Sequence, residues 1–272
     1  DRLRSAEQIA SLMAAYAVSP KEQLKQTAYR LQLAEHWGIP TGARVLEIGC
    51  GQGDTTAVLA EVVGPNGHVT GIDPAPPEYG APITLGDSAQ HLQQGTYGSV
   101  VDMRLGFTNW STVANDYDYA VLAHCVWYFA SYEVLVQTLR EARQRARKLC
   151  FTEWSLQPLH PGQIPHAFAV TFLQLVSKFH PELELNIQSP FSESKIVEAL
   201  ECAGWDIESR HVVEQPDVDD GRWEVEELLR LAERADLNLP AEVQSWLKDQ
   251  GATVRAYGPD FATLPSFSLI CT

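Results

Sequence analysis

Strand-like and helix-like segments alternate along most of this chain. From residue 43 onward, short runs of β-branched and apolar residues are separated by longer stretches with helical period. This alternation is typical of βαβ units, in which helices join parallel strands. Strands are expected at 43–49, 68–73, 99–105, 117–124, 148–154, 205–213 and 266–272, and helices near 55–63, 88–93, 132–147, 167–179, 192–203, 222–235 and 240–250. The sequence therefore predicts an α/β fold built on one mainly parallel sheet.

The first strand leads into a glycine-rich loop, VLEIGCGQGD at 45–54. Gly49, Gly51 and Gly53 let the backbone approach a ligand closely, and the following helix directs its N-terminal N–H groups into the same crevice. Twenty residues past Gly53, the second strand ends in Asp73, whose carboxylate can accept hydrogen bonds from the two hydroxyls of a ribose. The loop and the acid together indicate a ligand of the adenosine type.

The acidic residues of the loop argue against a dinucleotide. The NAD fingerprint would place a third glycine at position 54, where this chain has Asp54, and a carboxylate there would repel a pyrophosphate. Glu47 adds a second carboxylate behind the loop. A ligand that carries an ammonium and a sulfonium group suits this environment better.

The loop resembles that of class I S-adenosylmethionine-dependent methyltransferases, whose motif E-x-G-x-G-x-G matches Glu47, Gly49, Gly51 and Gly53. The resemblance implies a Rossmann-like seven-stranded sheet in which the last strand is antiparallel and lies between the fifth and sixth. It also implies S-adenosylmethionine as cofactor and S-adenosylhomocysteine as product. The cofactor contacts expected from it are Glu47, Gly49, Cys50, Gly51, Gly53, Asp54, Asp73, Pro74, Asn109, Trp110 and Ala123.

The residue that binds the adenine is less clear than the loop. In the family an acidic residue often follows the third strand, but GFTNW at 106–110 offers only Thr108 and Asn109. Asn109 can accept a hydrogen bond through its amide oxygen and is preferred. Asp87 is the alternative, although only 14 residues separate it from Asp73. Phe107 and Trp110 could stack on the ring.

Candidate catalytic residues follow the fourth and fifth strands and enter the segment after them. His124 ends the fourth strand and Glu153 the fifth, at the sheet edge where α/β folds bind ligands; either could act as a base. His166, which enters the lid helix, could contact the substrate and contribute to catalysis in that way. The alternatives are a hydrogen-bonded structural role for His124 and a solvated loop position for His166. Trp127, Tyr128 and Trp154 are expected to line the substrate pocket, although Trp127 and Tyr128 could instead pack against the next helix.

The chain divides into four parts on this interpretation. Residues 1–40 form a helical cover, 41–154 the cofactor-binding core, and 155–190 a lid insertion. Residues 191–272 complete the sheet and carry a helical insertion at 217–258. The first residue is Asp1 rather than Met, so the sequence leaves open an upstream segment such as a targeting peptide.

Charge and cysteine content exclude several classes of partner. With 20 Lys+Arg and 35 Asp+Glu, the net charge is −15, which disfavours nucleic acids and anionic membrane surfaces. The apolar run 119–130 is shorter than the roughly 20 residues of a membrane span. Five scattered cysteines without a CxxC pair favour free thiols and a cytoplasmic location. The histidines form no closely spaced pair, so the sequence does not indicate a metal site. The oligomeric state stays open.

The function expected is therefore methyl transfer from S-adenosylmethionine to a small-molecule acceptor at O, N, S or C. The segments HCVWYF and TEW also resemble enzymes of microbial, especially fungal, secondary metabolism. The main alternative is an enzyme of this fold that uses the bound cofactor for a non-methylating reaction such as a ring-forming rearrangement. A regulatory binding protein and a nicotinamide dehydrogenase are weaker alternatives, because the glycine loop is intact and carries Asp54.

Overall fold

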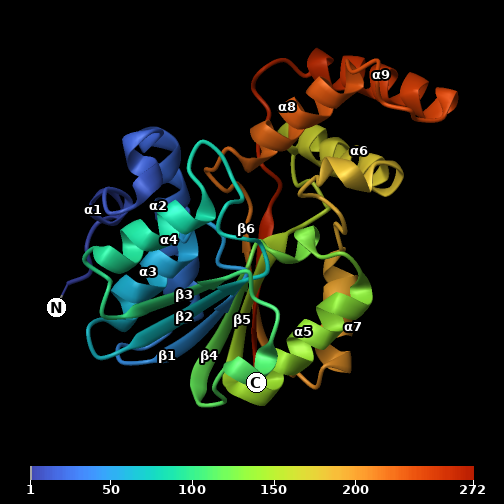
Figure 1. Cartoon of the computed structure of the whole chain (residues 1–272). Helices are drawn as coiled ribbons and strands as arrows, with labels where there is room; N and C mark the ends of the chain where they lie inside the picture. Colours follow the sequence, from blue (N-terminus) through green and yellow to red (C-terminus); the bar gives the residue numbers. More distant parts are fainter. Residues whose placement is uncertain (1) are drawn as a thin grey trace.

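Seven strands form one mixed sheet in the order β3-β2-β1-β4-β5-β7-β6 (Figure 1). The computed structural model describes residues 2–272. Strands β1 to β5 run parallel, and β7 is antiparallel to both β5 and β6. The predicted α/β fold with an inserted antiparallel last strand is confirmed. The strands are β1 (Arg44–Ile48), β2 (His68–Asp73), β3 (Val101–Leu105), β4 (Tyr117–Ala123), β5 (Ala146–Trp154), β6 (Ile207–Val213) and β7 (Ser266–Cys271).

Helices cover both faces of the sheet. Helices α1 to α4 lie together on one side and α5 and α7 on the other (Figure 1), which is why the central strands are apolar on both faces. The helices are α1 (Ala6–Ala10), α2 (Pro20–Trp37), α3 (Asp54–Val63), α4 (Leu85–Gln94), α5 (Tyr132–Arg145), α6 (Ile164–Phe179), α7 (Glu193–Cys202), α8 (Asp220–Ala232) and α9 (Ala241–Ala256). Short 3-10 turns are η1 (Ala14–Ala17), η2 (Trp110–Thr112), η3 (Val126–Tyr128), η4 (Pro161–Gln163) and η5 (Pro181–Leu183).

The ends of several helices differ from the ranges expected from the sequence, and the contacts of α4 and α9 show why two of them do. Helix α4 begins at Leu85 rather than near residue 88, because the Thr84 side chain caps it by accepting a hydrogen bond from the backbone N–H of Asp87. Helix α9 continues to Ala256, past the glycine at which the sequence predicts its end. Gly251 is buried there, and a Cβ at this position would lie 3.6 Å from the Cβ of Ala232 on α8. Tertiary packing thus outweighs the low helix propensity of glycine.

The N-terminal segment is held on the core by α2. Trp37 is 2% exposed, and its Nε1 donates a hydrogen bond to Oγ1 of Thr152 on β5, at 3.3 Å. The same face of the helix, one or more turns earlier, buries the polar residues Gln23, Gln26 and Arg30. The predicted helical cover is therefore part of the wall around the carboxyl ends of the strands.

Helices α6, α8 and α9 form a single layer beyond those strand ends (Figure 1). Val170 and Leu173 of α6 are buried, as are Val225 and Leu228 of α8, because the apolar stripes of the two helices pack together. The sequence treated 155–190 and 217–258 as separate insertions. In the fold they join into one lid.

Candidate active site

The glycine loop turns sharply between β1 and α3. Gly49, Gly51 and Gly53 have φ angles of 80°, 49° and 90°, a left-handed conformation that glycine adopts without steric cost. The backbone N–H groups of Gly49 and Cys50 donate to the carbonyl of Ile72, at 2.8 and 3.2 Å. The loop is thereby fixed to β2 and opens toward the end of that strand.

The three glycines are required for different reasons. A Cβ at Gly49 would lie 2.5 Å from the Cβ of Cys125, and one at Gly53 would lie 3.4 Å from Leu92 and Met103. At Gly51 no protein atom lies within 4 Å of that position. Packing therefore explains Gly49, whereas the contacts at Gly53 are ordinary van der Waals distances and its φ of 90° explains the glycine there. Gly51 borders open space, which is what close approach by a ligand needs.

Asp73 is oriented by the backbone around it. Its Oδ2 accepts a hydrogen bond from the N–H of Gly51 and its Oδ1 one from the N–H of Ala75, both at 2.9 Å. Each oxygen keeps a further lone pair. The carboxylate is fixed beside the open space over Gly51 and can accept from two vicinal hydroxyls, so these residues fit a ribose.

Glu47 is 2% exposed, and Oγ1 of Thr56 donates to its Oε2. Burial raises the pKa of Glu47 to about 8, an effect that the hydroxyl of Thr56 and the guanidinium of Arg30 oppose. In the absence of a ligand cation, the carboxyl group is thus mostly protonated at neutral pH. The negative charge expected at this position develops when an ammonium group arrives beside it.

His124 stands at the centre of a buried polar cluster at the ends of β4 and β5. It is the first residue after β4 and has a φ of 55°, which is uncommon outside glycine. Its Nε2 lies 2.8 Å from the hydroxyl of Tyr29, which donates to Oγ of Ser266 at 2.7 Å. Its Nδ1 lies 3.2 Å from Oε1 of Glu153. Trp154 stacks on the imidazole, with ring centroids 3.7 Å apart.

Burial keeps this cluster uncharged. It lowers the pKa of His124 well below the usual value and raises the pKa of Glu153 to about 8. A neutral Glu153 carboxyl then donates to Nδ1 of His124, and the Nε2–H of His124 donates to the oxygen of Tyr29. This tautomer is assigned from the hydrogen-bond partners, and it leaves no free ring nitrogen.

His166 reaches the same cluster from the lid helix α6. Its Nδ1 accepts a hydrogen bond from the backbone N–H of Leu264, at 2.9 Å, so Nε2 carries the proton and donates to Oε2 of Glu224 on α8, at 2.5 Å. Its ring meets Trp154 edge to face, with centroids 6.3 Å apart. The fold thus brings together His124, Glu153, Trp154 and His166, which the sequence selected separately.

The two aromatic residues of η3 differ in their surroundings. Trp127 is 1% exposed, and its Nε1 donates to the carbonyl of Phe191. Tyr128 is 46% exposed, yet surrounding protein raises the pKa of its hydroxyl, as do the nearby carboxyls of Glu224 and Asp220. Tyr128 is therefore the accessible ring of this pair.

The remaining predicted contacts lie around the loop. Cys50 is buried against β2, where a Cβ on Gly71 would lie 2.9 Å from its Cβ, and Ala123 is buried at the end of β4. Pro74 is exposed after Asp73. Asp54 accepts from Nε2 of Gln23, at 2.9 Å.

The adenine candidates are not distinguished by their contacts. The amide oxygen of Asn109 accepts from the N–H of Ser111 and caps η2. Trp110 meets Phe107 edge to face, with centroids 5.1 Å apart. Asp87 is exposed in the first turn of α4. The preference for Asn109 over Asp87 stays a prediction.

The sequence analysis missed the contributions of α2 and α8. Gln23, Gln26 and Arg30 recur at helical spacing and form a polar face that resembles a solvated one, but this face is buried against α3 and α8. Nε2 of Gln26 donates to Oδ2 of Asp220, at 2.8 Å. The two glutamines were the one sequence feature that pointed to burial of this face, because the polar face of an exposed helix more often carries charged residues.

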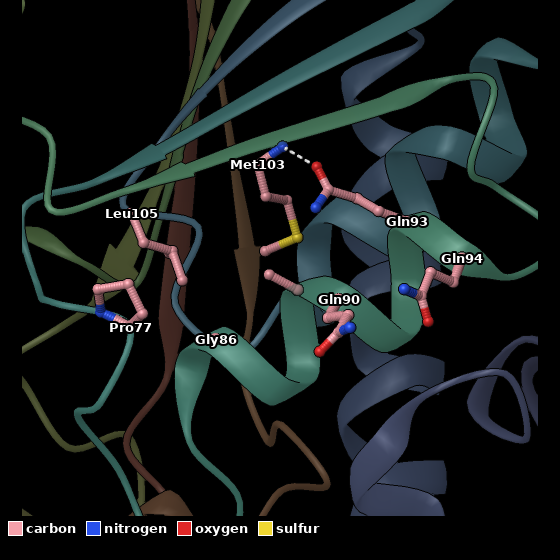
Figure 2. Close-up of a pocket in the computed structure, with 8 residues that line it drawn as sticks. Pro77, Gly86, Gln90, Gln93, Gln94, Met103 and Leu105 are labelled. Atoms are coloured by element: carbon pink, nitrogen blue, oxygen red, sulfur yellow. Dashed lines mark hydrogen bonds between the residues drawn. The ribbon is translucent and has the colours of Figure 1, made fainter.

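A hollow of about 420 Å³ lies between α4 and β3 (Figure 2). It is lined by Pro77, Gly86, Ala89, Gln90, Gln93, Gln94, Met103 and Leu105, and the amide oxygen of Gln93 accepts from the N–H of Met103. Neither Asp73 nor any loop glycine lines it, and none of its side chains can ionise. We therefore assign no chemistry to it.

Within residues 2–272, no group of three or more His, Cys, Asp and Glu side chains is placed to hold a metal ion. Among the same residues, no helix is both long enough and apolar enough to span a membrane.

The sheet order and the loop facing Asp73 define the class of Rossmann-like S-adenosylmethionine-dependent methyltransferases. A family model described as a methyltransferase domain matches residues 21–210, and the chain belongs to this family. S-adenosylmethionine is accordingly the cofactor, and the open space over Gly51 beside Asp73 fits it.

Individual relatives agree with this assignment. The methyltransferase phomM' of Diaporthe leptostromiformis is 26% identical over 208 residues, which cover 61% of this chain and 54% of that protein. The chain thus spans about half the length of this curated relative. The crystal structure of a cyclopropane-fatty-acyl-phospholipid synthase-like protein from Lactobacillus casei ATCC 334 has a TM-score of 0.89 and 34% identity over 98% of both chains. The crystal structure of the [4+2]-cyclase SpnF shares the fold, with a TM-score of 0.52 and 16% identity. The match covers 90% of this chain and 80% of the SpnF chain.

The open space over Gly51 predicts that Gly51→Ala weakens cofactor binding. The added methyl group meets no protein atom, and a left-handed alanine costs about 1–2 kcal/mol. We expect S-adenosylhomocysteine affinity, measured by calorimetry, to fall at least about tenfold, because a methyl group in the ligand space has no room to relax. Gly38→Ala is a matched control, since Gly38 has a φ of 64° and equally open surroundings away from the loop. Equal affinities in the two variants would contradict this prediction.

The buried Glu153 carboxyl predicts stability that declines with rising pH. Its pKa of about 8 in the fold exceeds the ordinary 4.5, so the folded protein keeps a proton that the unfolded chain has lost, and rising pH favours unfolding until about pH 8. Below about pH 6.5, His124 has the opposite effect because its pKa is lowered. The net decline is therefore expected between about pH 6.5 and 8.

Replacing Glu153 by glutamine tests this decline. Glu153→Gln keeps the shape of the neutral carboxyl, and we expect it to reduce the loss of unfolding free energy between pH 6.5 and 8 by about 2 kcal/mol. Urea titrations of both proteins at the two pH values measure the difference. Glu47 has the same effect in both proteins and cancels. If wild type and variant lose the same free energy, Glu153 does not titrate as described.

Proposed function

We propose that this protein transfers the methyl group of S-adenosylmethionine to a nucleophilic O, N, S or C atom of a small molecule. The observation that carries the proposal is the arrangement around Gly51. A carboxylate held by two backbone N–H groups lies beside an open loop, and a buried aromatic and polar cluster follows at the next strand ends. Cofactor and acceptor would therefore meet between β1 and β4.

In this proposal the chain's own residues mainly position the cofactor and the acceptor and exclude water from the site. The bound cofactor supplies an electrophilic methyl group. Asp73 orients the ribose, and Glu47 receives the ammonium of the amino-acid end. Tyr128, which is 46% exposed, would give the acceptor an aromatic wall, whereas Trp154 is 3% exposed and stacks on His124, so it holds that imidazole in place. Holding two reactants in line is itself a large source of rate enhancement.

We propose His124 as the proton acceptor, with Glu153 orienting it and His166 holding the lid against Trp154. Both nitrogens of each imidazole bind protein groups. A base role for His124 therefore requires two changes. The cluster must lose one proton, so that the ring carries its proton on Nδ1 and donates it to an ionised Glu153, and the hydroxyl of Tyr29 must leave the unprotonated Nε2, so that the acceptor can give its proton to that nitrogen. Where the acceptor needs no deprotonation, the same cluster acts by position alone.

The acceptor is proposed to be small, fairly apolar, and uncharged or cationic. Support comes from the exposed ring of Tyr128 and from the acidic groups Asp220 and Glu224 near it. The relatives are described as a methyltransferase and as a cyclopropane-fatty-acyl-phospholipid synthase-like protein, so a carbon acceptor belongs within the range. A place in microbial secondary metabolism stays a prediction, as does the absence of nucleic-acid partners. The five free cysteines support the proposed cytoplasmic location.

A non-methylating reaction is the second candidate. SpnF, described as a [4+2]-cyclase, has this fold, so the fold by itself does not distinguish the two functions. In such a reaction the positive sulfonium would act as a fixed charge and the methyl group would stay in place.

Thermal unfolding with and without S-adenosylmethionine tests the cofactor. At 100 times its dissociation constant, the ligand should add about 2.7 kcal/mol to the free energy of unfolding. We expect Asp73→Ala to reduce this gain because the ribose hydroxyls lose their acceptor. If the wild type gains nothing, or if the variant gains as much as the wild type, the binding mode is wrong.

Transfer of a labelled methyl group separates the two candidate functions. The protein is incubated with methyl-labelled S-adenosylmethionine and a panel of phenols, amines, thiols and unsaturated acyl chains. Label in any acceptor, with release of S-adenosylhomocysteine, supports methyl transfer. Conversion of a panel compound with all label left in the cofactor would support the rearrangement instead.

A further inference from the structure

Ser266 and Tyr29 form the far end of a buried hydrogen-bond network that contains His124. Ser266 is 1% exposed at the start of β7, and Tyr29 is 3% exposed on α2. The hydroxyl of Tyr29 donates to Oγ of Ser266 at 2.7 Å, and its oxygen lies 2.8 Å from Nε2 of His124. Nδ1 of the same ring lies 3.2 Å from Oε1 of Glu153. Side chains from four separate elements are thus linked end to end.

The direction of the hydrogen bond at Ser266 fixes the protons along this network. A phenol hydroxyl has one proton, and Tyr29 gives that proton to Ser266. The oxygen of Tyr29 can therefore only accept from His124, so Nε2 carries a proton. A neutral imidazole has one N–H, and burial keeps His124 neutral by lowering its pKa well below the usual value. Nδ1 then has no proton, and its hydrogen bond with Glu153 requires a protonated carboxyl.

Release of a proton from the network requires the opposite direction of donation. Glu153 and His124 share two protons, one on the carboxyl and one on Nε2. When one of them passes to water, the other occupies Nδ1 and faces the ionised carboxylate of Glu153. Nε2 is then unprotonated and faces lone pairs on the oxygen of Tyr29, as long as that hydroxyl points to Ser266. The hydroxyl must turn to Nε2 and lose its bond to Ser266, so Ser266 opposes the release.

We propose that Ser266 and Tyr29 are positioning residues that hold His124 in its Nε2–H form and so prevent it from acting as a base until the direction of donation reverses. This inference rests on the proposed function, in which His124 accepts a proton. Ser266 acts through the hydroxyl of Tyr29 rather than on the acceptor. The resting site then holds its base in an inactive tautomer.

The charged groups around the network come from elements other than β7. Burial lowers the pKa of His124, Arg30 on α2 and His166 on α6 lower it further, and Asp220 on α8 opposes them. Burial raises the pKa of Glu153 to about 8, against the effect of neighbouring backbone N–H groups, and Asp220 adds to the rise. A substitution on β7 leaves all these groups in place. A change in titration would therefore report the hydroxyl bond itself.

The tautomer of His124 tests the proposal without cofactor or acceptor. Long-range ¹H–¹⁵N NMR spectra of ¹⁵N-histidine-labelled protein distinguish an Nε2–H ring from an Nδ1–H ring, and His124→Gln identifies the signals. We expect the wild type to have Nε2–H at pH 7 and to change to Nδ1–H with a midpoint near pH 8, where Glu153 titrates. Ser266→Ala should lower this midpoint by about 0.4–1 pH unit, because one hydrogen bond no longer favours the Nε2–H form. Ser266→Cys, whose thiol is a weaker acceptor, should shift it in the same direction.

Ser268→Ala is the matched control. Ser268 lies on the same strand, is 2% exposed, and its Oγ bonds Oγ1 of Thr152 at 2.6 Å, so this variant should keep the wild-type midpoint. A Tyr29→Phe background gives the second control. There Ser266→Ala should change the midpoint by less than about 0.3 pH unit, because the hydroxyl that connects Ser266 to the ring is gone.

Each outcome has a definite meaning. An Nδ1–H ring in the wild type at pH 7 overturns the proposal, whether or not the variants fold. An unchanged midpoint in the Ser266 variants overturns it too, as does an equal shift in Ser268→Ala, because general loosening of β7 would act in that way. The spectra need no methyl transfer. An Nε2–H ring in a protein that transfers no label would refute the proposed function alone, and an Nδ1–H ring in one that does would refute this inference alone.

Discussion

The left-handed turn from Gly49 to Gly53 is the constraint on which the rest of the site depends. Because Gly49 and Cys50 both donate to Ile72, the turn is locked onto β2, and the N–H of Gly51 then meets Asp73. A side chain at Gly49 would displace Cys125, which directly follows His124. One backbone geometry therefore sets the ribose site and the start of the polar cluster together.

Burial determines the charges around this turn more than residue type does. Glu47 and Glu153 are both held with a pKa of about 8, and the pKa of His124 is lowered, because each group loses its hydration. The net charge of −15 therefore gives a poor description of the cavity, where several of these acids and bases are neutral. Arg30 is the contrasting case, since a guanidinium cannot escape burial by losing its proton.

The sheet and the glycine loop could be predicted because their signals are local. Strand periodicity, the loop spacing and Asp73 lie in short segments. The end of α9 was changed by tertiary packing, whereas the start of α4 follows from the local Thr84 cap. His124, Glu153, Trp154 and His166 were selected individually from their places at strand and helix ends. Their partners Tyr29 and Glu224 come from distant helices. No local pattern reports which face of α2 or α8 will meet the sheet.

The two elements that the sequence described least well also enclose the site together. Helix α2 and lid helix α8 meet through Gln26 and Asp220, and through Lys25 and Asp219 at 3.3 Å. Lys25 is 40% exposed, and exposed pairs of this kind stabilise by about 0–1 kcal/mol. The α6 to α8 contact is apolar and buried. The lid helices are thus joined to one another by apolar packing and to α2 by a polar seam of one buried hydrogen bond and one half-exposed ion pair.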